Sequence, residues 1–72
     1  MEIEFFGQLT EKHKNMYNMT IENSMTIAEL AAKLGVDEDS VGLITINGIQ
    51  SEQQDFVAEN DRICFFPPMS GG

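Results

Sequence analysis

The chain has 72 residues, 12 of them acidic and 4 basic, a formal net charge of −8, and a single cysteine. A domain near this size buries only about 60–65% of the surface that its unfolded chain exposes, so it has a thin core, and a self-contained enzyme with a deep pocket is not expected. The negative charge argues against nucleic-acid binding, which needs lysine and arginine, and suits either a basic groove on a protein partner or solubility alone.

The first predicted elements are two strands. Residues 2–9 alternate apolar and polar side chains, with Ile3, Phe5 and Leu9 on one face, which is the period of a half-buried strand. Residues 17–23 alternate in the same way. The polar segment between them is short, so we expect the two strands to form a hairpin.

A helix is predicted next, over residues 26–35. Its apolar stripe has the spacing i, i+3, i+4 and i+7 and consists of Ile27, Leu30, Ala31 and Leu34. Thr26 and Glu29 have the spacing of a capping box at the start of a helix. Gly35 is placed to end it.

The second half of the chain again predicts strands. Residues 41–47 are apolar and β-branched, Asn47-Gly48 is typical of a tight hairpin turn, and Ile49 begins a short returning strand. Residues 51–61 read as a loop, with Phe56 and Val57 tucked beneath it. Residues 62–66 form the last strand, with Ile63 and Phe65 inward.

This order of elements predicts an α+β fold of the β-grasp (ubiquitin-like) type. One helix crosses one face of a mixed sheet of four to five strands, and the first and last strands lie side by side in the middle. Residues 1–68 are expected to form the domain. Residues 69–72 are expected to form a flexible C-terminal tail that ends in Gly-Gly.

No set of catalytic or metal-binding residues is evident. His13 lies between two lysines in a predicted turn and reads as a solvated loop residue. Cys64 has only Arg62 nearby as a cation, so we interpret it as a small, semi-buried strand residue rather than a nucleophile. The acidic run 37–39 lacks the spacing of a metal-binding loop. No apolar stretch is long enough for a membrane span, and a cytoplasmic protein without a bound metal or cofactor is expected.

Two phenylalanines and the C-terminal tail stand out. By alternation Phe6 and Phe66 point away from the helix, and their rings should meet on the open face of the sheet as a candidate interaction patch, although single exposed apolar residues are ordinary. Pro67 and Pro68 then stop the last strand, and the remaining tail residues are Met69, Ser70, Gly71 and Gly72. Glycine has no side chain to pack, so a bare terminus of this kind suits a narrow site on a partner.

These segments resemble the MoaD/ThiS family of ubiquitin-like sulfur carriers along the whole chain. The matching segments are IEFFGQL, TIAELAAKLG, INGI, ENDRICFFPP and the terminal Gly71-Gly72. Within the family the chain is most similar to the MoaD branch, the small subunits of molybdopterin synthase. The usual Asp-Gly-Asp before the last strand is here Glu59-Asn60-Asp61.

The resemblance implies a specific chemistry at Gly72. A ubiquitin-activating-type enzyme would use ATP to adenylate its carboxylate, and sulfur from a sulfurtransferase or cysteine desulfurase would then give a thiocarboxylate. The large subunit of molybdopterin synthase would receive this sulfur for the dithiolene of molybdopterin. The chain itself would be a non-catalytic subunit, with residues 67–71 threading into its partners.

The resemblance also implies partner contacts at Phe6 and Phe66, and at Ile49 beside Gln50. Two alternatives remain open from the sequence. One is a sulfur carrier for thiamine or tRNA, and the other is a protein modifier conjugated to lysine through Gly72.

Overall fold

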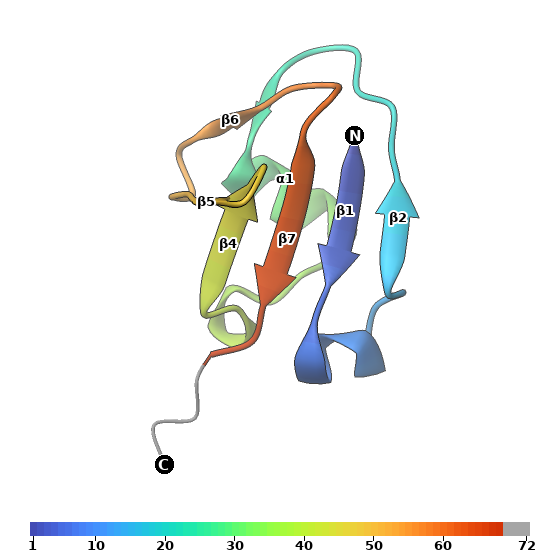
Figure 1. Ribbon diagram of the computed structural model, residues 1–72, viewed down its shortest axis with the longest axis vertical. Coiled ribbons are helices and arrows are strands. Elements are labelled where there is room, and N and C mark those ends of the chain that lie inside the picture. Colours follow the sequence, from blue (N-terminus) through green and yellow to red (C-terminus); the bar gives the residue numbers. More distant parts are fainter. Residues whose placement is uncertain (69–72) are drawn as a thin grey trace.

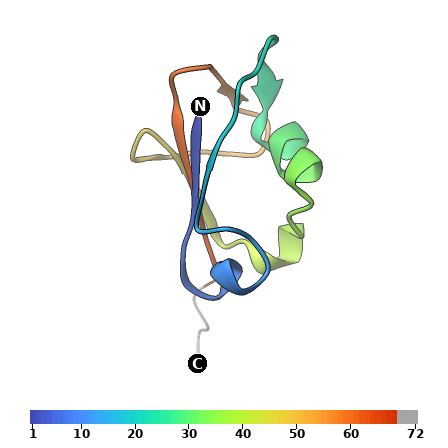
Figure 2. The ribbon, with the colours of Figure 1, turned by 90° about the vertical axis from the view of Figure 1, so that its right-hand side faces the viewer.

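The computed structural model describes residues 1–68 and shows a mixed five-stranded sheet with one α-helix, α1 (Ile27–Leu34), across one face (Figures 1 and 2). The strand order in the sheet is β2-β1-β7-β4-β5. The strands are β1 (Glu2–Phe5), β2 (Met16–Asn18), β4 (Leu43–Ile46), β5 (Ile49–Gln50) and β7 (Arg62–Phe66). The predicted α+β, β-grasp architecture is confirmed.

The first and last strands of this sheet, β1 and β7, are central and parallel. Their register runs from Glu2↔Arg62 to Phe5↔Phe65, and the other strand pairs of the sheet are antiparallel. The turn between β4 and β5 consists of Asn47 and Gly48, with φ of 54° and 83°. Positive φ at both positions is what a two-residue hairpin turn requires, so the predicted turn is also confirmed.

Helix α1 begins and ends where its sequence predicts. The Thr26 hydroxyl accepts a hydrogen bond from the Glu29 backbone N–H, and the Glu29 carboxylate accepts one from the Thr26 N–H, which completes the capping box. At the other end Gly35 has φ of 75°, a left-handed conformation that glycine adopts without steric cost. Ile27 and Leu30 are buried against the sheet.

Both predicted strands of the N-terminal hairpin are shorter in the structure. β1 ends at Phe5 rather than Leu9, because Gly7 has φ of 60° and a 3₁₀ helix follows over Gly7–Glu11. Leu9 still reaches the core, from this 3₁₀ helix instead of a strand. β2 covers Met16–Asn18 rather than residues 17–23.

A second, two-stranded sheet was not predicted. β6 (Phe56–Val57) lies within the expected loop 51–61 and pairs antiparallel with β3 (Met25–Thr26). Val57 is buried as expected, but Phe56 is 67% exposed. Val57 lies opposite Met25 in this pairing and Phe56 opposite Thr26, so adjacent residues point to opposite sides. The expectation that Phe56 is tucked under the loop was wrong.

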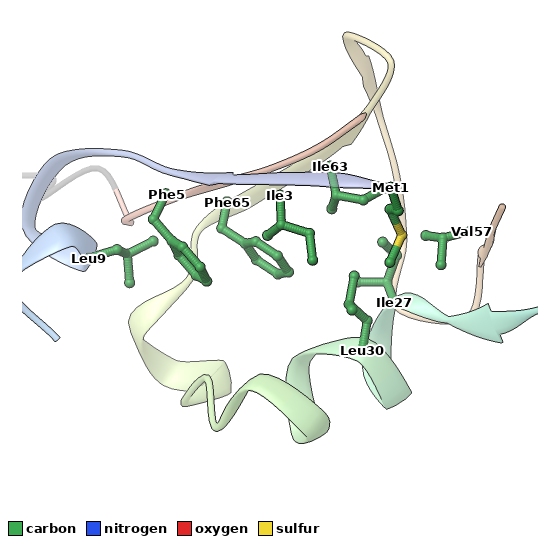
Figure 3. Packing of buried hydrophobic residues seen from close by; sticks show 9 residues of the cluster. All are labelled: Met1, Ile3, Phe5, Leu9, Ile27, Leu30, Val57, Ile63 and Phe65. Atoms are coloured by element: carbon green, nitrogen blue, oxygen red, sulfur yellow. The ribbon is translucent and has the colours of Figure 1, made fainter. Parts of the chain in front are cut away.

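The core lies between the sheet and α1. Its buried residues are Met1, Ile3, Phe5, Leu9, Ile27, Leu30, Val57, Ile63 and Phe65 (Figure 3). Phe5 and Phe65 stack with their ring centroids 5.1 Å apart. Figure 3 shows Leu9 and Phe5 at one end of this core and Ile27, Leu30 and Val57 at the other. The inward residues of β1 and β7 thus form the core on the helix side of the sheet, and this face is not available to a partner.

Candidate functional site

Phe6 and Phe66 meet on the face of the sheet opposite α1, which we call the open face. Phe6 directly follows β1 and Phe66 ends β7, so each comes one residue after the opposed core pair Phe5↔Phe65. The Phe6 N–H donates to the Phe65 carbonyl oxygen at 3.1 Å and extends the pairing past the end of β1. The ring centroids of Phe6 and Phe66 are 4.6 Å apart and the ring planes differ by 9°. The predicted convergence is confirmed, and we call these two residues the ring pair.

The ring pair continues into further half-buried side chains on the open face. Leu43 lies directly opposite Phe66 across the β4–β7 pairing, and Thr45 lies opposite Cys64. Directly opposed residues of neighbouring strands point to the same face. Leu43 and Cys64 are both half-buried, so they extend the apolar surface along the sheet, and the expectation of a semi-buried Cys64 is confirmed.

A salt bridge borders this apolar surface. The Arg62 guanidinium donates to the Glu4 carboxylate, and both residues occupy open-face positions of β7 and β1. The hydrogen bond and the negative charge of Glu4 raise the pKa of Arg62. The open face therefore combines an aromatic and aliphatic centre with a charged border, which is the composition of many protein-binding surfaces.

Pro67 and Pro68, which together we call the tail root, pack closely against two glycines, Gly7 and Gly42. A Cβ on Gly7 would lie 2.8 Å from Pro67 Cγ, and one on Gly42 would lie 2.4 Å from Pro68 Cα. Gly42 also donates its N–H to the Phe66 carbonyl oxygen at 2.8 Å. The tail root thus leaves the sheet between the ends of β1 and β4, beside the ring pair. Residues Met69, Ser70, Gly71 and Gly72, predicted as the reactive tail, lie outside the described residues.

Ile49 is not brought together with the ring pair. Its side chain is 71% exposed, but β5 pairs Ile49 with Ile46, which packs against the core. Ile49 therefore lies on the helix side of the sheet, whereas Gln50, opposite Thr45, lies on the open face. A partner that covers the ring pair would meet Gln50 before Ile49.

His13 and the acidic run 37–39, which the sequence offered as other candidate site residues, have structural roles instead. His13 is half-buried and stacks on Phe5 with ring centroids 4.6 Å apart, so its interpretation as a solvated loop residue was wrong. Asp37 accepts a hydrogen bond from the Asp39 N–H at 3.0 Å and caps the 3₁₀ helix Glu38–Ser40. Within residues 1–68 no group of three or more His, Cys, Asp or Glu side chains gathers as metal ligands. No helix in that part of the chain is long and apolar enough to cross a membrane.

Sequence reasoning missed Gly7 and Gly42. An isolated glycine in a strand pattern signals a close approach of another backbone, and Gly42 interrupts the apolar run at residues 41–47. That signal was present, but it does not say which segment approaches. The contact with Pro68 joins residues 26 positions apart in the sequence and follows from the β4–β7 pairing.

Comparison with known proteins supports this reading of the fold. The model of the ThiS family matches residues 3–72. Among solved structures, the crystal structure of SAMP1 from Haloferax volcanii is similar, with a TM-score of 0.75 and 22% sequence identity. That match covers 99% of this chain and 97% of SAMP1. No curated protein sequence gave a match.

Proposed function

Because the chain belongs to the ThiS family of ubiquitin-like sulfur carriers, we propose that it carries sulfur as a thiocarboxylate on Gly72 and donates it as the small subunit of molybdopterin synthase. Members of this family are small proteins that do not catalyse reactions on their own. Activating enzymes and sulfur-transfer proteins are their general partners. Sulfur transfer is common to the family. Our more specific proposal is that the acceptor of the sulfur is the precursor of molybdopterin.

One observation carries the proposal: the ring pair lies directly beside the tail root. Gly72 follows Phe66 by six positions in the sequence. An extended chain spans at most about 3.3–3.6 Å per residue, so the reacting carboxylate can lie no more than about 22 Å from Phe66 along the chain. A partner that docks on the open face can thus bind the stacked rings and receive the C-terminus in an adjacent slot.

The activation step supplies the leaving group that a carboxylate lacks. A carboxylate oxygen of Gly72 attacks the α-phosphorus of ATP, a P–O bond forms, and pyrophosphate leaves. The terminal sulfur of a persulfide on the sulfurtransferase or cysteine desulfurase then attacks the acyl carbon, and AMP leaves. A thiol of that partner cleaves the S–S bond, which produces a disulfide and the free thiocarboxylate. ATP is consumed by the partner, and no cofactor is bound by this chain.

In this proposal residues 1–68 bind the partner proteins, and the bonds form and break at Gly72. The stacked rings offer rigid aromatic anchors of the kind that dominate binding energy when a partner buries them. The net charge of −8 suits a basic surface on the large subunit and on the adenylating enzyme, and it raises the rate of encounter more than the affinity. We place the exchange with these partners in the cytoplasm, where ATP is available.

Intact mass of the protein purified from its own cells tests the sulfur chemistry. We expect a fraction with a gain of about 16 Da, because sulfur replaces one oxygen of the terminal carboxylate. Deleting Gly72 should abolish this gain and leave the melting temperature unchanged, since residue 72 lies beyond the tail root. A wild-type protein that never gains this mass under molybdenum-requiring growth would contradict the proposal.

The acceptor is tested by reconstitution. The thiocarboxylate form is mixed with the large subunit of molybdopterin synthase and the cyclic pterin precursor, and dithiolene formation is measured. If the thiocarboxylate instead transfers its sulfur only to a thiazole synthase or to tRNA, the acceptor is that molecule and not the molybdopterin precursor. An isopeptide-linked Gly72 on lysines of other proteins, without any thiocarboxylate, would identify a modifier instead.

A further inference from the structure

The absence of a side chain at Gly42 has a specific structural cause. Gly7, Gly35 and Gly48 have positive φ, whereas Gly42 does not, so a residue with a side chain could adopt its backbone conformation. What excludes a side chain is space. The Cβ of an alanine at this position would lie 2.4 Å from Pro68 Cα, 2.9 Å from Pro68 N and 3.0 Å from Pro67 O.

All three of these neighbours are backbone atoms of the tail root. Backbone atoms cannot rotate away as the end of a flexible side chain can, so the contact is relieved only if the backbone of the tail root and that of residue 42 move apart. Ordinary van der Waals contact with a Cβ begins at 3.4 Å, so the distance between the added Cβ and Pro68 Cα would have to increase by about 1 Å.

Gly42 is also tied to the strand from which the tail leaves. Its N–H donates to the Phe66 carbonyl oxygen at 2.8 Å, next to the opposed pair Leu43↔Phe66. Proline has no N–H, so neither Pro67 nor Pro68 can donate a hydrogen bond that would fix the direction of the chain. Packing against the glycines replaces that missing restraint. Gly7 makes the corresponding contact with the Pro67 ring from the β1 side.

We propose that Gly42 is a positioning residue, whose bare backbone sets the direction in which the C-terminal segment leaves the sheet relative to the ring pair. This inference rests on the proposed function of Gly72. A partner that binds the ring pair then meets the tail root at a defined position beside it, from which the C-terminus starts toward the reacting site. A displacement of about 1 Å at a reacting centre can cost about 100-fold in rate, even when the cause lies outside that centre.

The test compares Gly42→Ala with Gly35→Ala, which adds the same methyl group elsewhere. Gly35 has φ of 75° and no atom within 4 Å of its added Cβ, so its substitution strains the backbone without touching the tail root. Each variant is titrated as the substrate of the cognate adenylating enzyme in ATP–pyrophosphate exchange. We expect Gly42→Ala to lower kcat by about 10- to 100-fold with KM unchanged, since the ring pair still docks. Gly35→Ala should keep wild-type kcat and KM at a temperature where it is folded.

A second pair of variants separates positioning from loss of folding. Pro68→Gly releases the tail root, so adding Gly42→Ala to it should cause no further loss of kcat. An equal loss on both backgrounds, or wild-type kcat for Gly42→Ala alone, would overturn the role of Gly42 and leave the carrier function intact. Failure of the wild-type protein to support exchange or to gain sulfur would instead overturn the proposed function, and this inference with it.

Discussion

Two pairs of phenylalanines lie one residue apart on the same two strands and have opposite surroundings. Phe5 and Phe65 stack with centroids 5.1 Å apart and are fully buried under α1. Phe6 and Phe66 stack with centroids 4.6 Å apart and remain half-buried on the open face. Successive side chains of a strand point to opposite faces, so each Phe-Phe dipeptide is divided between them. Near-identical stacking thus serves folding on one face and leaves an aromatic surface for a partner on the other.

The largest expected effect breaks the buried pair. Phe65→Ala should lower the free energy of unfolding by about 3–5 kcal/mol, because it removes a fully buried ring and leaves a cavity. Scaled by chain length, the whole domain has only about 4–11 kcal/mol. Urea melts followed by circular dichroism measure the loss. A loss of only about 0.5 kcal/mol, as for a surface substitution, would contradict the assignment of Phe65 to the core.

Leu30 tests the same core from the helix side. Leu30→Ala should cost about 2–4 kcal/mol, since Leu30 is fully buried between α1 and the sheet. Ala28→Gly, at an exposed position in the first turn of the same helix, is the control and should cost at most about 1 kcal/mol through helix propensity. Equal losses for the two variants in urea melts would contradict the assigned helix face.

The half-buried pair should show the reverse balance. Phe66→Ala should change the free energy of unfolding by no more than about 1 kcal/mol, yet weaken binding to the proposed partner, the large subunit of molybdopterin synthase, by about 2 kcal/mol or more. Calorimetric titration beside urea melts measures both quantities. Ile49→Ala is the matched control, because Ile49 is more exposed but lies on the other side of the sheet. Unchanged affinity for Phe66→Ala with a large loss of stability would assign Phe66 to the core.

The smallest effect is expected at the charged border of the ring pair. Glu4→Gln removes the salt bridge to Arg62, whose side chain is largely exposed, and should change the free energy of unfolding by less than about 1 kcal/mol. Its effect should appear in the salt dependence of the association rate instead, measured by stopped flow. A Glu4→Gln variant whose stability falls as much as that of Leu30→Ala would contradict this assignment.

The parts of the fold that were predictable depend on neighbours in the sequence. Thr26, Glu29 and Gly35 define α1 through contacts within a few residues, and Asn47-Gly48 forms its turn in the same way. Alternation also predicts the faces of the buried pair, Phe5 and Phe65, and of the ring pair, once β1 and β7 are placed side by side.

What the sequence did not predict depends on contacts between distant segments. Phe56 and Val57 form a strand only because residues 25 and 26 pair with them. The end of β1 at Phe5 coincides with the left-handed Gly7, which packs against Pro67 from the opposite end of the chain. His13 is sheltered by Phe5 after a 3₁₀ helix folds back. In the candidate site, the convergence of the rings was predictable, but the contact of Gly42 with the tail root was not.

The parallel pairing of β1 with β7 has a consequence for the order of events in folding. Glu2 lies opposite Arg62, so the central pair of the sheet joins residues 60 positions apart and cannot form until β7 has been synthesised. Long-range pairing of this kind slows folding relative to a helical protein of similar size. The ring pair depends on the same register as the buried pair, so both should appear in one late step. An incompletely folded molecule then displays no stacked rings, and an activating enzyme that binds them spends ATP only on carriers that have finished folding.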